Sequence, residues 1–99
     1  MRKHGRSDAN QALIIKALRQ AGISVQPLQS VGCGCPDLLC GYLGANTLLE
    51  VKDAAQPPSG RRLTPEQQEW QAGWRGQVNV VETPEQAIRI CQLQSELPF

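Results

Sequence analysis

The chain has 99 residues, of which 40% are hydrophobic and 19% charged, and its formal net charge is +1. This length suits one compact domain and is too short for two, and the composition excludes disorder along the whole chain. No apolar run approaches the roughly 20 residues of a membrane-spanning helix, and no apolar segment follows the first basic residues as in a signal peptide. We therefore expect an intracellular protein without a membrane partner.

Basic residues gather at two places, although the total charge is close to zero. One group opens the chain, and the other follows a Pro-Gly segment. Basic ends and loops can contact phosphate without a basic total. We interpret residues 1–6 as a flexible basic arm, and both groups as either solvated surface or nucleic-acid contacts. The candidate DNA contacts are Arg2, Lys3, Arg6, Arg61 and Arg62.

Residues 7–99 are predicted to form a single α/β domain that begins with a helix. Ser7 or Asp8 can cap this helix, its apolar residues recur at helical spacing, and Gly22 suits its C-terminal end. A first strand is expected at 23–28, at a sheet edge or at its own end because Pro27 cannot donate to a ladder. A loop with two glycines leads from it to the next strand.

Two apolar strands, 38–43 and 47–51, are predicted to form a β-hairpin. Gly44-Ala45-Asn46 suits the tight turn between them. Apolar residues occupy nearly every position, as expected of central strands that are covered on both faces.

The second half of the chain adds a loop, two helices and a strand. Residues 54–62 show no periodicity and are expected to be a loop. Thr64-Pro65-Glu66-Gln67 predicts a helix start, with threonine as N-cap, proline at N1 and glutamine in a capping box. A strand at 78–82 and a last helix after a second Thr-Pro-Glu-Gln complete the order α-β-β-β-α-β-α. This order predicts a central mixed sheet flanked by helices.

Four cysteines have a spacing that favours free thiols. They are Cys33, Cys35, Cys40 and Cys91. A C-x-C pair lacks the C-x₂-C spacing of common zinc modules, and a disulfide framework is not expected in a reducing compartment. We expect buried free thiols, with a zinc module of the first three cysteines as the alternative.

The hairpin should gather three ionisable residues at one end of the sheet. Pairing about the turn brings Asp37 opposite the end that carries Glu50 and Lys52, which share a face while Val51 points away. Phosphodiester hydrolysis needs a cation that neutralises the phosphate and activates water. Asp37, Glu50 and the backbone carbonyl of Val51 could bind Mg²⁺, and Lys52 could hold the attacking water or offset developing charge. A salt-bridged sheet end is the alternative.

These residues and their surroundings resemble a known family. Pro36-Asp37, thirteen positions before Glu50, and the Glu-x-Lys that ends at Lys52 resemble the signature of the PD-(D/E)xK nuclease superfamily. A glycine-containing loop precedes Pro36-Asp37, and a Pro-x-Gln-x-x-Trp segment follows at 65–70. The combination is similar to the small virus-type replication-repair nuclease (VRR-NUC) domains, from the first helix to the strand at 78–82.

The resemblance implies a restriction-endonuclease-like fold and a Mg²⁺- or Mn²⁺-dependent DNA endonuclease. It further implies a homodimer directed at branched DNA such as Holliday junctions, in bacterial cytoplasm or as a phage protein in the host cytoplasm. Asp37 and Glu50 would bind the metal, Lys52 would assist the nucleophile, and Gln67 would be an accessory polar residue of the catalytic site.

One departure from the family pattern concerns the first helix. Many relatives carry a glutamate there, whereas this chain has Asp8 and Asn10 in the matching region, and we regard both as possible accessory residues. The departure leaves a second function open: a weak or inactive module of the same fold that binds DNA structures. Trp70 and Trp74, four residues apart, are interpreted as core or dimer contacts.

Overall fold

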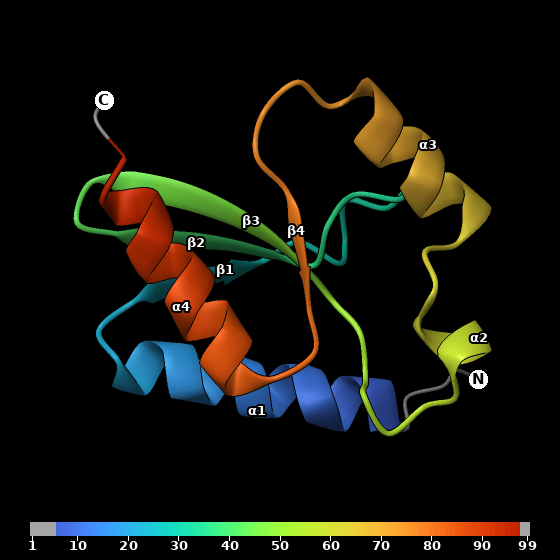
Figure 1. Cartoon of the computed structure of the whole chain (residues 1–99), viewed down its shortest axis with the longest axis horizontal. Coiled ribbons are helices and arrows are strands. Elements are labelled where there is room, and N and C mark those ends of the chain that lie inside the picture. Colours follow the sequence, from blue (N-terminus) through green and yellow to red (C-terminus); the bar gives the residue numbers. More distant parts are fainter. Residues whose placement is uncertain (1–5, 98–99) are drawn as a thin grey trace.

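The helices and strands follow one another in nearly the order expected from the sequence, with one short helix added. The computed structural model describes the backbone of residues 6–97 and the side chains of residues 9–97. The elements are α1 (Arg6–Gln20), β1 (Ser24–Pro27), β2 (Leu38–Tyr42), β3 (Ala45–Val51), α2 (Pro58–Arg61), α3 (Pro65–Gly73), β4 (Asn79–Val81) and α4 (Pro84–Ser95) (Figure 1).

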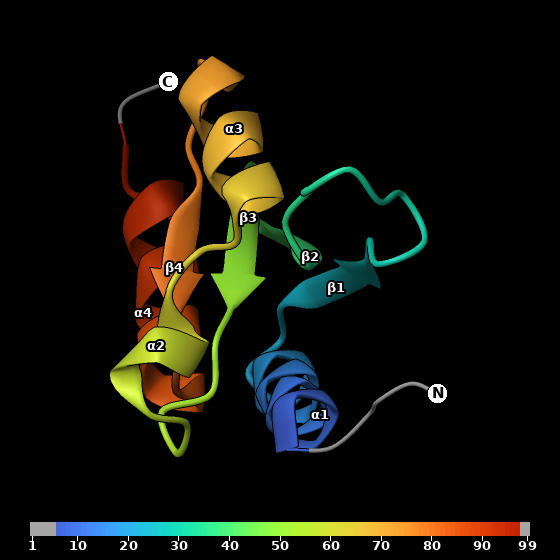
Figure 2. The ribbon, with the colours of Figure 1, turned by 90° about the vertical axis from the view of Figure 1, so that its right-hand side faces the viewer.

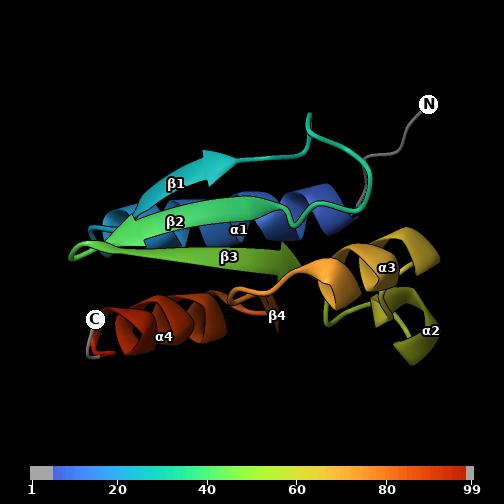
Figure 3. The ribbon, with the colours of Figure 1, turned by 90° about the horizontal axis from the view of Figure 1, so that it is seen from above.

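The strands form one mixed sheet in the order β1-β2-β3-β4. β2 pairs antiparallel with β1 and β3, whereas β4 is parallel to β3. β1 lies at an edge, as Pro27 predicted. The long connection that a parallel pair requires contains α2 and α3, which lie beyond the end of the sheet where β3 finishes (Figure 3). The prediction of a single α/β domain with a mixed sheet is confirmed.

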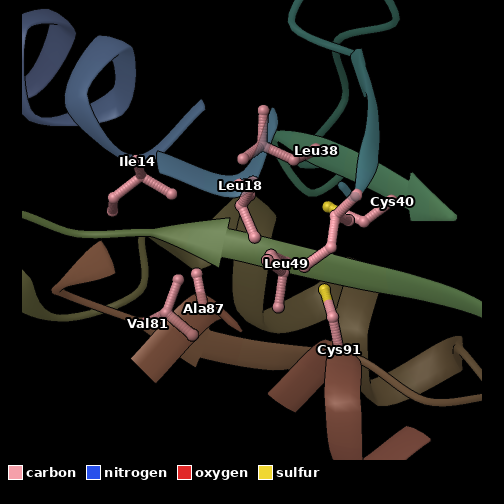
Figure 4. Packing of buried hydrophobic residues seen from close by; sticks show 9 residues of the cluster. Ile14, Leu18, Leu38, Cys40, Leu49, Val81, Ala87 and Cys91 are labelled. Atoms are coloured by element: carbon pink, nitrogen blue, oxygen red, sulfur yellow. The ribbon is translucent and has the colours of Figure 1, made fainter. Parts of the chain in front are cut away.

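The hydrophobic core lies between one face of the sheet and two helices. α1 runs beneath β1 and α4 lies beside β4 (Figure 2), and the two helices also pack against each other. Alternate strand residues supply the sheet side of the core (Figure 4). The core residues are Ile14, Leu18, Ile23, Leu38, Cys40, Leu49, Val81, Ala87 and Cys91.

The opposite face of the sheet is only partly covered, so the prediction of strands covered on both faces is wrong. Leu39 and Val80 on this face are 36% and 44% exposed. Both α1 and α4 belong to the core face, and α3 makes no close backbone contact with any other helix or strand within residues 6–97. Part of the outer face is therefore an apolar surface that is only half covered.

The hairpin turn lies earlier in the chain than expected. Ala45 and Asn46 already belong to β3, and Tyr42 pairs with Ala45. The turn residues are Leu43 and Gly44, with φ of 50° and 84°. Two-residue hairpins favour positive φ at both central positions because that geometry matches the strand twist. Leu43 therefore adopts the left-handed region, and the β2–β3 ladder extends to the Tyr42–Ala45 pair.

Two predictions about helices also need correction. Residues 54–62 are not wholly a loop, because α2 occupies Pro58–Arg61. Pro58 stands at its first turn, where the fixed φ of proline suits a helix start. α1 already includes Arg6, before the expected cap, a difference of the size that helix ends commonly show. No helix in the described residues is long and apolar enough to cross a membrane.

Candidate active site

The open end of the hairpin brings Asp37 against the end of β3, as predicted. Leu38 and Leu49 form the last residue pair between β2 and β3, and β3 continues to Val51. Asp37 immediately precedes β2, and its Oδ2 accepts a hydrogen bond of 2.8 Å from the Val51 backbone N–H. This bond fixes the Asp37 carboxylate beside the Glu50–Lys52 segment.

Glu50 is buried and only half satisfied. Its residue is 1% exposed. Oε2 accepts a hydrogen bond of 2.9 Å from Gln67 Nε2 and lies 3.8 Å from Lys52 Nζ, so Glu50 and Lys52 share a face as predicted. Oε1 is buried and has no hydrogen-bond partner. An unpartnered buried carboxylate oxygen is costly, and a cation is a partner that would satisfy it.

Burial and a neighbouring carboxylate both disfavour the ionised form of Glu50. Burial first, and then the neighbouring Asp37 carboxylate, raise the pKa of Glu50 to about 8, and Lys52 opposes this shift only in part. Burial and the charges of Glu50 and Asp37 also raise the pKa of the Cys35 thiol. A divalent cation beside the two carboxylates would relieve their repulsion and favour the ionised form of both.

Gln67 joins this site to the start of α3. Its Oε1 accepts hydrogen bonds from Lys52 Nζ at 2.8 Å and from the Thr64 backbone N–H at 2.9 Å. Thr64 Oγ1 accepts from the Gln67 backbone N–H at 3.2 Å, which completes the predicted capping box. With Nε2 on Glu50, the single amide caps the helix and also orients Glu50 and Lys52.

Val51 is the natural source of a backbone ligand. In an extended strand the N–H and C=O of one residue point toward the same edge, so the Val51 carbonyl lies on the side of Asp37. No group of three or more His, Cys, Asp or Glu side chains within the described part of the chain is arranged to hold a metal. Two carboxylates and one carbonyl would be the protein's share of a Mg²⁺ shell that retains several waters.

Among the described side chains of the first helix, Asn10 supplies an amide that binds backbone carbonyls beside the site. Asn10 Nδ2 donates to the carbonyls of Lys52 at 2.8 Å and Glu82 at 3.2 Å. Asn10 therefore ties α1 to the ends of β3 and β4, and acts on the site through the position of Lys52. The Asp8 side chain lies outside the described residues.

The candidate DNA contacts differ in their freedom. The Nη1 atom of Arg61 lies 3.7 Å from Oε1 of Glu82, and Arg61 is half-buried, whereas Arg62 is exposed. An arginine that already has an intramolecular acid partner is the weaker phosphate contact of the two. Arg2, Lys3 and the Arg6 side chain fall outside the described residues.

The prediction of buried free thiols is confirmed only in part. Cys40 and Cys91 are buried free thiols, but Cys33 is exposed and Cys35 half-buried. Trp70 and Trp74 stack with ring centroids 4.6 Å apart. Trp74 is 45% exposed, so of its two predicted roles, core or dimer contact, the dimer contact stays a prediction. The sequence reasoning also missed Cys35 as a neighbour of the carboxylates. Its position two residues before Asp37 was the available signal.

Comparisons with known proteins give no information on function, so the function is argued from the site. A scan against protein-family models, a search of curated proteins and a search of solved structures found no match to this chain. The geometry nevertheless defines a site of two carboxylates, one ammonium group and one amide at a sheet end. Such a set can bind a divalent cation and donate hydrogen bonds to an anionic substrate.

Proposed function

We propose that the chain is a DNA endonuclease that hydrolyses phosphodiester bonds with Mg²⁺ or Mn²⁺, with a restriction-endonuclease-like fold of the VRR-NUC type. The observation that carries this proposal is the buried Glu50, whose Oε1 has no partner while Asp37 and Lys52 stand beside it. A purely structural ion pair would leave no reason to bury one carboxylate oxygen without a donor. The sequence resemblance to PD-(D/E)xK nucleases supports the same conclusion.

The residues have distinct roles in the proposed reaction. Asp37, Glu50 and the Val51 carbonyl would hold the ion, which when bound lowers the pKa of a water molecule and offsets phosphate charge. Lys52, whose side chain is 11% exposed, donates hydrogen bonds to the attacking water or the phosphate oxygens. Gln67 hydrogen-bonds to both the Lys52 ammonium group and the Glu50 carboxylate, and so fixes their relative position.

The substrate proposed is branched DNA, such as a Holliday junction, cut by a homodimer. The family resemblance supports this choice, and two copies related by a two-fold axis would place two sites on symmetry-related strands. The apolar outer face of the sheet, with Leu39 and Val80 exposed, offers surface for such an association. A monomeric mass by light scattering at micromolar concentration would refute the dimer without affecting the proposed chemistry.

A module that binds DNA structures without cutting them is the second candidate. The observation that favours it is that Asn10, where relatives carry a first-helix glutamate, uses its amide to bind two backbone carbonyls. This function predicts binding that does not depend on Asp37 or Lys52.

One cleavage panel separates the two candidates. Duplex, single-stranded, flap and four-way-junction DNA are each incubated with Mg²⁺, Mn²⁺ or chelator. The variants are Asp37→Asn and Lys52→Met, and the matched controls are Glu85→Gln and Lys16→Met, whose wild-type side chains are exposed. We expect metal-dependent cutting by the wild type and both controls only. If all five proteins bind junction DNA equally and none cuts, the nuclease proposal is wrong and the binding module stands.

A further inference from the structure

The position of α3 relative to the hairpin is set by very few contacts. Gln67 on α3 reaches Glu50 and Lys52, yet within residues 6–97 the backbone of no other helix or strand comes close to that of α3. Side-chain hydrogen bonds of a long, flexible glutamine do not by themselves fix a helix. Another contact must hold the first turn of α3 at the right distance from the sheet.

That contact comes from the loop between β1 and β2, which Figures 1 and 2 show running up to α3. At Gly34 this loop meets the helix backbone to backbone. A Cβ built on Gly34 would lie 2.7 Å from the carbonyl carbon of Glu66, closer still to its oxygen, and 3.1 Å from the Gln67 nitrogen. Only glycine permits this approach, because real Cβ atoms essentially never come so near to backbone atoms.

The shape of the loop is specific. Gly32, Cys33 and Gly34 all have positive φ, at 76°, 57° and 81°. A cysteine in this region is strained, and such strain persists only where the surroundings determine the conformation. The loop is closed by a 2.8 Å hydrogen bond from the Leu28 N–H to the Asp37 carbonyl. One short segment therefore carries Asp37 at its end and contacts the Gln67 turn three residues earlier.

We propose that Gly34 is a positioning residue of the active site: its missing side chain lets the loop seat the first turn of α3, so that the Gln67 amide meets Glu50 and Lys52. This inference rests on the proposed nuclease function for its kinetic consequence only. The contact joins Asp37 and Gln67 through one short segment of backbone, which sets the distance between the two parts of the site when α3 is docked. A methyl group at position 34 would push α3 away and carry Gln67 with it.

Gly34→Ala tests this inference against Gly32→Ala as a matched control. Both variants put a side chain at positive φ in the same loop, but a Cβ at Gly32 has nothing within 4 Å. The protein is studied in full length, with kcat and KM measured on the substrate that the wild type cuts best. The Gln67 side-chain NH₂ is followed by ¹⁵N NMR in metal-free protein, where its bond to a buried carboxylate should slow hydrogen exchange.

We expect Gly34→Ala to lower kcat on the order of 10²-fold, the cost of displacing a reacting group by about 1 Å, with KM little changed. The Gln67 NH₂ signals should move toward those of a solvated glutamine. Gly32→Ala should retain the wild-type kcat and NH₂ signals. A merely structural Gly34 would instead lower the free energy of unfolding while leaving both readouts of the folded molecules unchanged, and that result would overturn the inference.

A measurement on the wild type keeps the inference testable if Gly34→Ala does not fold. The Gly34 Hα protons should show a nuclear Overhauser effect to the Gln67 backbone amide proton, and its absence would overturn the proposed contact. If the wild type cuts no DNA, the proposed function fails, but the NMR comparison of the two variants still decides whether Gly34 positions Gln67.

Discussion

Replacing Glu50 with glutamine should stabilise the metal-free protein at alkaline pH. The side chain of Glu50 is buried, and burial together with Asp37 raises its pKa from 4.5 to about 8. Between these two values the folded protein binds more protons at this position than the unfolded chain does, so the free energy of unfolding must fall as pH rises. Glutamine is neutral, keeps nearly the same shape and has no such dependence.

The size of the effect follows from the difference between the folded and unfolded pKa of Glu50. A tenfold change in an acid dissociation constant corresponds to about 1.36 kcal/mol, and most of the interval from 4.5 to about 8 lies between pH 5 and pH 8. The contribution of Glu50 to the free energy of unfolding should therefore decrease on the order of 3 to 4 kcal/mol across this range. That is a large part of the stability of a small domain.

Urea unfolding at pH 5, 6, 7 and 8 in the presence of chelator measures the effect, with tryptophan fluorescence and far-UV circular dichroism as probes. The quantity of interest is the difference between Glu50→Gln and the wild type at each pH, because titrating groups that do not interact with Glu50 cancel in it. Glu85→Gln, at an exposed position, is the control and should show no pH-dependent difference. If the Glu50→Gln difference is also independent of pH, Glu50 titrates as an exposed acid, and the reasoning from its burial is wrong.

Three further outcomes are expected. Saturating Mg²⁺ or Mn²⁺ at pH 8 should raise the urea midpoint of the wild type by mass action. The urea midpoint of Asp37→Asn should stay the same with and without metal. Equal shifts in both proteins would place the metal elsewhere. Gln67→Ala should abolish most cleavage and lose about 1 kcal/mol of stability with the hydrogen bond that its side chain accepts from the Thr64 backbone. Gln86→Ala, at the same position of the α4 start, loses a similar bond from the Glu82 backbone and should lose only stability. Equal loss of activity in both would deny Gln67 a role in the site. Gly44→Ala, at φ 84°, should cost about 1 to 2 kcal/mol in urea unfolding, whereas Gly73→Ala, with open space around its Cα, should not; equal costs would contradict the turn geometry.

The parts of the fold that sequence reasoning located are those set by local chemistry. Thr64 and Gln67 lie three residues apart, so their capping box can be predicted from the sequence, and it is present in the structure. The period of two placed Glu50 and Lys52 on one face of β3, and the hairpin then brought Asp37 to Val51. None of these inferences requires knowledge of a distant segment.

The parts that the sequence concealed depend on distant partners. Asn10 binds the carbonyl of Lys52, 42 residues away, and nothing in its neighbourhood predicts that partner. Gln77 uses its side-chain amide to exchange two hydrogen bonds of 2.8 Å with the Leu48 backbone, and so extends the β3 edge where β4 has not yet begun. The approach of Gly34 to Glu66 is equally invisible, because a glycine in a loop usually serves only a turn.

The sparse attachment of α3 divides the candidate site into two regions of different local stability. Glu50 belongs to β3 and Asp37 immediately precedes β2, whereas Gln67 lies on α3, whose backbone makes no close contact with that of any other helix or strand within residues 6–97. Segments with few packing contacts open without global unfolding. Amide protons of α3 should therefore exchange with solvent well before those of β3, and bound DNA should slow their exchange. Such an opening of α3 would separate Gln67 from Glu50 and Lys52 while Asp37 stays bound to the Val51 backbone.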